Sequence, residues 1–228
     1  PMSAAPSSVA IDRSRIESIV ADVLVRHLAP TTKSATAESS PLVVNISVRH
    51  MHITQEHLEI LFGPGAELTP ARDLYQDGQF AAEQTVDLVG PKRRMLNAVR
   101  ILGPTRPQSQ IELAFSDAIM LGIDVPVRMS GKVAGTPGCI VLGPRGHLVL
   151  PEGVIRAQRH VHMSPADAER YGVQNGDVMD LVVEHPTCPV TVGAIVVRVH
   201  PDFKLEVHLD SDERSEERRV GKECFVPC

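Results

Sequence analysis

Apolar residues near the start of the chain recur with the period of an α-helix. The i, i+3 and i+4 spacing is kept by Ile16, Ile19, Val20, Val23, Leu24 and Leu28. Charged residues occupy most of the other face, so the pattern predicts an amphipathic helix within residues 1–28. Residues 29–41, rich in Thr, Ser and Ala, predict a linker. Such a helix must bury its apolar face on the body of the protein, on a sister subunit or on a partner.

From Pro41 to Glu213 the apolar residues form short runs of strand length, separated by Gly and Pro. These runs are residues 42–48, 85–89, 96–102, 110–115, 139–142, 147–150, 178–183, 190–199 and 204–210. Runs of this length and spacing predict a mainly β fold, built as β-barrels or as a sandwich. Two short helices are expected between the strands, one capped by Thr54 and one by Ser164.

Composition and charge narrow the possible functions. Hydrophobic residues make up 43% of the 228, but aromatic residues only 3%, so the core must come from aliphatic side chains. The net charge of −5 and the scarcity of aromatics argue against a nucleic-acid partner. No apolar run approaches the ~20 residues of a membrane span, so we expect no membrane partner. The four cysteines form no CxxC pair and predict reduced thiols. Residues 214–228 are charge-dense without a period, and we interpret them as a non-native tail.

One short motif occurs twice. Arg49-His50-Met51-His52 is matched by Arg159-His160-Val161-His162, and each copy follows an apolar run and precedes a helix-capping residue. On a strand, residues i and i+2 point to the same face, so each copy can present two imidazoles side by side. The pattern of strand, His-x-His, capped helix, turn and strand predicts an internal repeat.

The repeat supplies a third candidate ligand for each histidine pair. Glu112 and His208 occupy corresponding strands, which gives the sets His50, His52, Glu112 and His160, His162, His208. A lone His-x-His is usually a surface or hydrogen-bonded feature, but a duplicated one with matched third ligands is typical of metal sites. Three nitrogen or carboxylate ligands without thiolate predict two zinc ions per chain, each with an open coordination position.

Arginines near these sets suggest an anionic ligand. Arg106 lies between Pro104 and Pro107, and its guanidinium could bind phosphate in bidentate fashion. The plain alternative is an arginine at the surface. Arg93, within Lys92-Arg93-Arg94, and Arg100 form a basic cluster that fits either a polyphosphate ligand or a solvated turn.

Several linked motifs resemble one family, the PduL-type phosphotransacylases, which are phosphate propanoyltransferases of bacterial microcompartments. The motifs cover roughly residues 42 to 213, and they are Ser47 to His52, Arg106 with Gln110-Ile111-Glu112, residues 134–138, residues 153–163, and residues 207–213. Two positions, Val48 and His200, depart from the family pattern, and neither is itself a candidate ligand.

This resemblance implies two β-barrels with short capping helices. Residues 42–48 would join residues 152–213 in the barrel that carries the second histidine set, and residues 49–151 would form the other barrel. It also implies coenzyme A in the cleft, phosphate on Arg106, and coenzyme A contacts from Ser47, Arg93 and Arg100. A homodimer is implied as well. The helix within residues 1–28 would be an encapsulation peptide that binds shell or lumen proteins and places the enzyme in the microcompartment lumen.

The function that follows is reversible transfer of an acyl group, propanoyl by resemblance, between coenzyme A and phosphate to give acyl phosphate. We expect the all-histidine zinc to be the better phosphate binder and the Glu112 zinc to lie nearer the thiol. Two alternatives stay open: a dinuclear zinc hydrolase of esters or amides, and a non-enzymatic metal-binding module associated with a shell.

Overall fold

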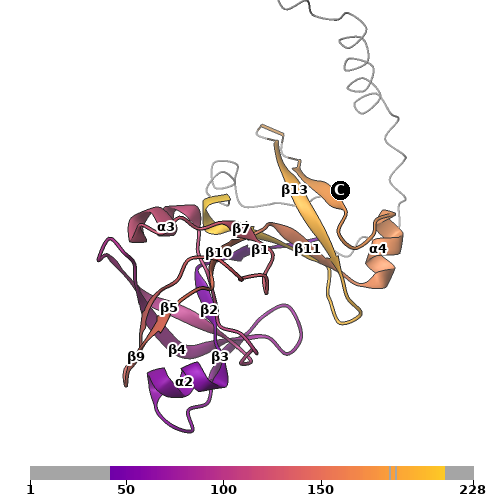
Figure 1. Ribbon diagram of the computed structural model, residues 1–228. Helices are drawn as coiled ribbons and strands as arrows, with labels where there is room; N and C mark the ends of the chain where they lie inside the picture. The colour runs from indigo at the N-terminus through magenta and orange to yellow at the C-terminus, as the bar shows by residue number, and fades with distance from the viewer. Residues whose placement is uncertain (1–41, 185, 188, 214–228) are drawn as a thin grey trace, which may run out of the picture. The chain divides into compact units, whose positions relative to one another are not determined.

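The computed structural model describes residues 42–184, 186–187 and 189–213 (Figure 1). The helix predicted within residues 1–28, the linker at 29–41 and the tail at 214–228 lie outside these residues. Strands make up most of the regular structure, which confirms the prediction of a mainly β fold. Within the described residues, no helix is both long and apolar enough to cross a membrane. Cys139, which the structure describes, is a buried free thiol.

The larger sheet curls around the first half of the body (Figure 1). In spatial order its strands are β7 (Val127–Arg128), β10 (Val154–Ala157), β6 (Gln110–Glu112), β2 (His50–His52), β5 (Met95–Gly103), β4 (Phe80–Val89), β8 (Cys139–Leu142) and β9 (His147–Leu150), with β3 (Pro70–Asp73) beside β4. The register shifts twice where β4 pairs with β5, and such bulges bend a strand and help a sheet to curl.

Side chains along β2 alternate between the two faces of the sheet, so that one face packs in the hydrophobic core and the other carries the two histidines. Met51 is fully buried in the aliphatic core, together with Ile101 of β5 and Ile111 of β6. His50 and His52 flank Met51 and therefore point to the opposite face. Both histidines are nevertheless buried, at 7% and 4% exposure, so a second layer must cover that face.

The smaller sheet has five strands. Their order is β1 (Val43–Ser47), β14 (Glu206–Asp210), β11 (His160–Met163), β13 (Val190–Val199) and β12 (Val178–Val183). The first strand of the body thus lies parallel to β14, close to the end of the described chain. Its separate core is aliphatic and includes Met163, Leu181 and Ile195.

The two histidine strands are paired in the same way. β2 runs parallel to β5 and antiparallel to β6, and β11 runs parallel to β13 and antiparallel to β14. His50 faces Glu112 across one pair, and His160 faces His208 across the other. β10 pairs with β6 and β7 in the larger sheet, although it lies within residues 152–213. The domain boundaries and the closure of each sheet into a barrel stay predictions.

Three helices lie entirely within the described residues. α2 (Gln55–Phe62) is capped by the Thr54 hydroxyl, and α4 (Pro165–Tyr171) begins with a capping box of Ser164 and Asp167, so both predicted helices are confirmed. The third, α3 (Phe115–Leu121), was not predicted, because the apolar run 110–115 continues into it and Ala114 offers no capping side chain. β3 and β7 also carry no buried apolar alternation that would have predicted them.

Polar contacts join the two sheets near the site. The Arg156 guanidinium on β10 donates to Asp210 at 2.6 Å and to Glu213 at 3.2 Å. At the start of α3, the backbone N–H and the hydroxyl of Ser116 both donate to Asp212, at 2.8 and 2.7 Å. β10 belongs to the larger sheet and α3 follows its strand β6, whereas Asp210 ends β14 and Asp212 and Glu213 come directly after it. These contacts therefore tie the two sheets together near the histidine strands.

Candidate metal centre and substrate cavity

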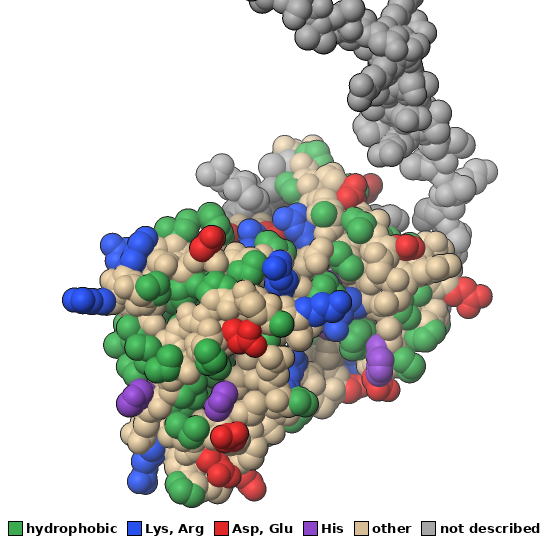
Figure 2. Space-filling view, in the orientation of Figure 1, with side chains coloured by type: hydrophobic (Ala, Val, Ile, Leu, Met, Phe, Trp, Pro, Cys, Tyr) green, Lys and Arg blue, Asp and Glu red, His purple; other side chains and the backbone are tan. Residues whose placement is uncertain are grey.

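A cavity of about 1100 Å³ is lined by residues of both sheets. His50, His52 and Glu112 come from the larger sheet, and His160 and His208 from the smaller one. Five arginines also line it, namely Arg49, Arg72, Arg100, Arg106 and Arg198. Figure 2 shows Lys and Arg side chains gathered near a hollow on the face drawn. Five carboxylates line it as well, those of Asp77, Glu112, Asp202, Glu206 and Asp210. The volume suits a ligand of drug size or larger, and the arginines offer donors to its anionic groups.

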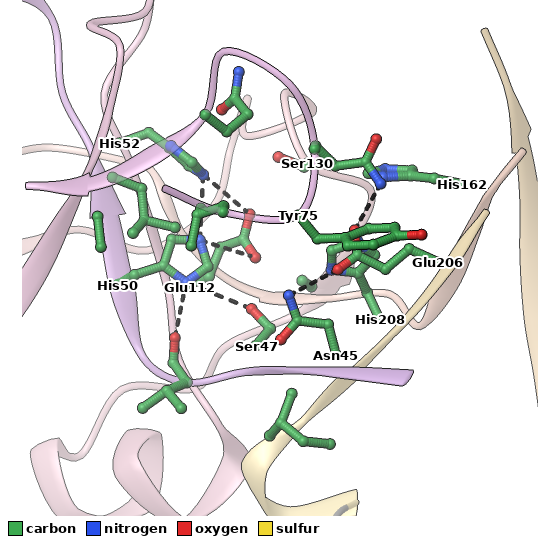
Figure 3. Close-up of a pocket in the computed structure, with 18 of the residues that line it drawn as sticks. Asn45, Ser47, His50, His52, Tyr75, Glu112, Ser130, His162, Glu206 and His208 are labelled. Atoms are coloured by element: carbon green, nitrogen blue, oxygen red, sulfur yellow. Dashed lines mark hydrogen bonds and ion pairs between the residues drawn. The ribbon is translucent and has the colours of Figure 1, made fainter. Parts of the chain in front are cut away.

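The first predicted ligand set is brought together. In Figure 3 the side chains of His50, His52 and Glu112 converge. The two Nε2 atoms lie 3.2 Å apart, and the Glu112 carboxylate oxygens lie 3.5 Å from His50 Nε2 and 4.0 Å from His52 Nε2. Ligands at 2.0–2.1 Å in tetrahedral geometry are separated by about 3.4 Å. The three side chains therefore fit a common metal ion.

The second predicted set is also brought together. The candidate ligand atoms of His160, His162 and His208 all lie within 4.8 Å of one another. The ring of His162 stacks on Phe203 with 4.1 Å between centroids, yet neither of its nitrogens has a hydrogen-bond partner. Buried polar atoms are rarely left without a partner. A metal ion bound by this set would satisfy that ring.

The first histidine of each pair is held in the same way. Nδ1 of His50 lies 2.8 Å from the Val48 carbonyl oxygen, and Nδ1 of His160 lies 2.8 Å from that of Gln158. A carbonyl can only accept, so Nδ1 carries the proton and Nε2 keeps its lone pair. Metal-binding histidines usually donate their other N–H in this manner. His50 and His160 are thus prepared to bind through Nε2.

Burial keeps several of these imidazoles neutral. Burial, together with the neighbouring His50 and Arg106, lowers the pKa of His52 to about 2. The same cause, with His208 as the main neighbour, lowers the pKa of His160 to about 4 and that of His162 to about 2. Only a neutral imidazole can bind a metal. At neutral pH these side chains are available as ligands without losing a proton.

Arg106 lies near the first set, where its charge contributes to the lowered pKa of His52. Its backbone N–H donates to Ile53, and its guanidinium donates to Ser130 at 3.5 Å and Gln79 at 3.4 Å. Burial is the main cause that lowers the pKa of Arg106, and Glu112 opposes it. The contacts to neutral partners are long, so the guanidinium is only loosely held and can turn to an anion.

Of the three residues predicted to contact coenzyme A, two line the cavity and one does not. Ser47 lines the cavity, with its hydroxyl 3.5 Å from His50 Nδ1. Arg100 also lines it and donates to the carbonyls of Ala82 and Glu83. Arg93 is exposed on the turn between β4 and β5 and does not line the cavity. The structure therefore brings two of the three to the site.

Three side chains of the site were not assigned a role from sequence. Gln110 is buried and donates to Glu112 at 2.5 Å and to Ser130 at 2.9 Å, so it orients the carboxylate ligand. Arg198 lines the cavity and faces His162 across the β11–β13 pair. The repeat would not have found Arg198, because Arg198 faces the second histidine of its motif whereas Arg100 faces the first, His50. Ser130 lies in a loop, and no pattern marks it.

Comparison with known proteins gives one consistent result. Residues 43–217 match the family model described as phosphate propanoyltransferase. A protein of Planctopirus limnophila with that name is 54% identical over 209 residues, which cover 89% of this chain and 86% of the relative. Those of Thermotoga maritima and Salmonella typhimurium are 48% and 46% identical and cover 75% and 76% of this chain, and 81% of each relative.

Proposed function

This chain belongs to the phosphate propanoyltransferase family, and we propose that it reversibly transfers an acyl group, propanoyl in the first place, between coenzyme A and phosphate. One observation carries the proposal: two three-residue sets that could hold metal ions and two half-buried arginines, Arg106 and Arg198, line a single cavity. That arrangement can hold a thioester and a phosphate close together, and proximity alone can supply much of the catalysis of a bimolecular reaction.

In the proposed reaction a phosphate oxygen attacks the thioester carbonyl carbon, the C–S bond breaks, and coenzyme A leaves as a thiolate. Arg106 and Arg198 would bind the phosphate and neutralise its charge, because both guanidiniums line the cavity beside the ligand sets. No covalent acyl-enzyme is needed, since both substrates can occupy the cavity at once. The reverse reaction uses the same groups.

We propose that both sets hold zinc, two ions per chain. The ligand separations and the absence of thiolate support this choice. Zinc bound there would supply Lewis-acid chemistry that lowers the pKa of a thiol and stabilises oxyanion charge. Gln110 orients Glu112, and the Val48 and Gln158 carbonyls fix the rings of His50 and His160.

Coenzyme A contacts remain part of the proposal. Ser47 and Arg100 lie on strands that border the cavity, which supports their role. Arg93 would contact a phosphate group of coenzyme A that extends beyond the cavity along the turn between β4 and β5.

The wider organisation is proposed from the family resemblance. An internal repeat would form two barrels, one from residues 42–48 and 152–213 and the other from residues 49–151, and two chains would form a homodimer. An encapsulation peptide within residues 1–28 would bind shell or lumen proteins in a microcompartment.

The test measures zinc per chain and acyl phosphate turnover in one preparation, before and after chelation. We expect two zinc ions, turnover that requires free coenzyme A, and loss of both on chelation. The double variant His50→Ala with His160→Ala should lose both, whereas His147→Ala, at an exposed histidine, should keep both. Turnover without coenzyme A would indicate a hydrolase. Zinc binding without any turnover would indicate a non-enzymatic module.

A further inference from the structure

The two ligand sets have matching neighbours in the strand register. Gln110 faces His52 across the β2–β6 pair, and Glu206 faces His162 across the β11–β14 pair. Each neighbour lies two residues before the third ligand, so it shares that ligand's face of the sheet. In the first set the amide of Gln110 donates to the carboxylate of Glu112. In the second set the roles are exchanged. The carboxylate belongs to the neighbour, Glu206, and the proposed ligand is its partner His208.

Glu206 has no exposed surface and is surrounded by donors. Its Oε1 accepts from the Asn45 amide at 2.8 Å, and its Oε2 accepts from the Gln76 amide at 2.6 Å. The same Oε2 lies 3.0 Å from His208 Nε2 (Figure 3). Each of the two carboxyl oxygens thus accepts an amide N–H, so the group acts as an acceptor and can accept from His208 as well.

The orientation of Gln76 is fixed from outside this group. Its Oε1 accepts from the Lys204 backbone N–H at 3.0 Å, and its Nε2 donates to the Lys204 carbonyl at 3.0 Å. The amide therefore cannot flip, and it must offer a hydrogen to Glu206. Gln76 belongs to the segment between β3 and β4 of the larger sheet, so this contact ties that segment to the start of β14.

We propose that Glu206 is a positioning residue for the second metal set. It accepts the Nε2–H of His208, which fixes that tautomer and leaves Nδ1 as the atom with a lone pair for the metal. Asn45 and Gln76 in turn hold Glu206, so the carboxylate and the ring are oriented before a metal binds. This role rests on the proposed function, in which both sets hold zinc. A carboxylate behind a metal-binding histidine also makes the ring a stronger ligand.

The test compares zinc retention in buffers of controlled free zinc. Glu206→Gln keeps the shape of the side chain and removes its charge, and Glu169→Gln makes the same change at an exposed position on α4. We expect Glu206→Gln to lose one of two zinc ions at roughly 10–100-fold higher free zinc than the wild type, with the other ion unchanged. Glu169→Gln should match the wild type. His208→Ala, which removes the ligand itself, identifies which of the two ions is lost.

A second variant guards against misfolding. Gln76→Ala leaves Glu206 in place but removes one of its donors, and we expect a smaller loss of affinity for the same ion. Equal weakening of both ions in Glu206→Gln, with a lower melting temperature of the metal-free chain, would show a general structural role and overturn the proposal. Unchanged affinity in both variants would also overturn it, as would a wild type without zinc. If zinc retention behaves as expected but no acyl transfer is found, only the proposed function fails.

Discussion

The buried histidines should make the metal-free protein sensitive to mild acid. His52, His160 and His162 have pKa values of about 2, 4 and 2 in the folded protein, against 6.5 for an unperturbed histidine. Below pH 6.5 the unfolded chain therefore binds more protons than the folded one. Stability then rises with pH, so it must fall as the pH is lowered from about 6.5.

The magnitude follows from the size of these pKa shifts. At pH 5 each of the three histidines is neutral when folded and largely protonated when unfolded, which costs about 2 kcal/mol per group. Together the three account for about 6 kcal/mol, comparable with the whole stability of many domains. The loss attributable to His160 should level off near pH 4, where its folded form also takes up a proton.

The assay is urea denaturation of the metal-free chain at a series of pH values between 8 and 5, chosen as about one and a half pH units on either side of 6.5. His162→Gln should reduce the slope of unfolding free energy against pH by about 1.4 kcal/mol per pH unit below pH 6. His147→Gln, at an exposed histidine, should leave the slope unchanged. A free energy of unfolding that stays constant between pH 7 and 5 would refute the view that these rings are held neutral by burial.

Three further predictions concern single side chains. Arg106→Lys keeps the charge but loses the planar pair of donors, so the KM for phosphate should rise by about 10–100-fold in steady-state kinetics while that for coenzyme A changes little. Leu181→Ala removes a side chain that is 1% exposed and should lower the free energy of unfolding by about 2–5 kcal/mol in urea denaturation. Ser164→Ala removes the hydroxyl that accepts from the Asp167 N–H and should cost about 0.5–2 kcal/mol in the same assay.

The first two of these predictions are contradicted by specific outcomes. An unchanged KM for phosphate in Arg106→Lys would show that the Arg106 guanidinium does not bind phosphate. Val178→Ala, at a side chain 63% exposed in the same strand as Leu181, is the matched control and should change stability by less than about 0.5 kcal/mol. If Leu181→Ala were equally mild, the core of the smaller sheet would be packed less well than the buried areas indicate.

The grouping of these histidines could be predicted because it depends on local rules. Strand alternation places His50 beside His52 and His160 beside His162, whatever the rest of the fold does. The third residue of each set required one more step, the comparison of two strands in the predicted repeat. In the structure Glu112 faces His50, and His208 faces His160. Helices with capping side chains were predictable for the same local reason.

What was missed depends on contacts between distant parts of the chain. Gln76 meets Glu206 across 130 positions, and neither residue stands out within its own segment. Helix α3 begins without a capping side chain, so its apolar residues looked like the end of a strand. Glu206 could have been found by extending the repeat two residues before each third ligand. At that position the first half of the chain has the neutral amide of Gln110, and the second half has the charged carboxylate of Glu206.

That exchange changes the electrostatic comparison of the two sets. By first ligands alone, the Glu112 set carries one negative charge and the all-histidine set none, which favours phosphate at the latter. Glu206 places one carboxylate directly beside the all-histidine set, because its Oε2 lies 3.0 Å from His208 Nε2. Ligand charge therefore no longer separates the two sets clearly. Placement of phosphate then depends on the guanidiniums of Arg106, near Glu112, and Arg198, which faces His162.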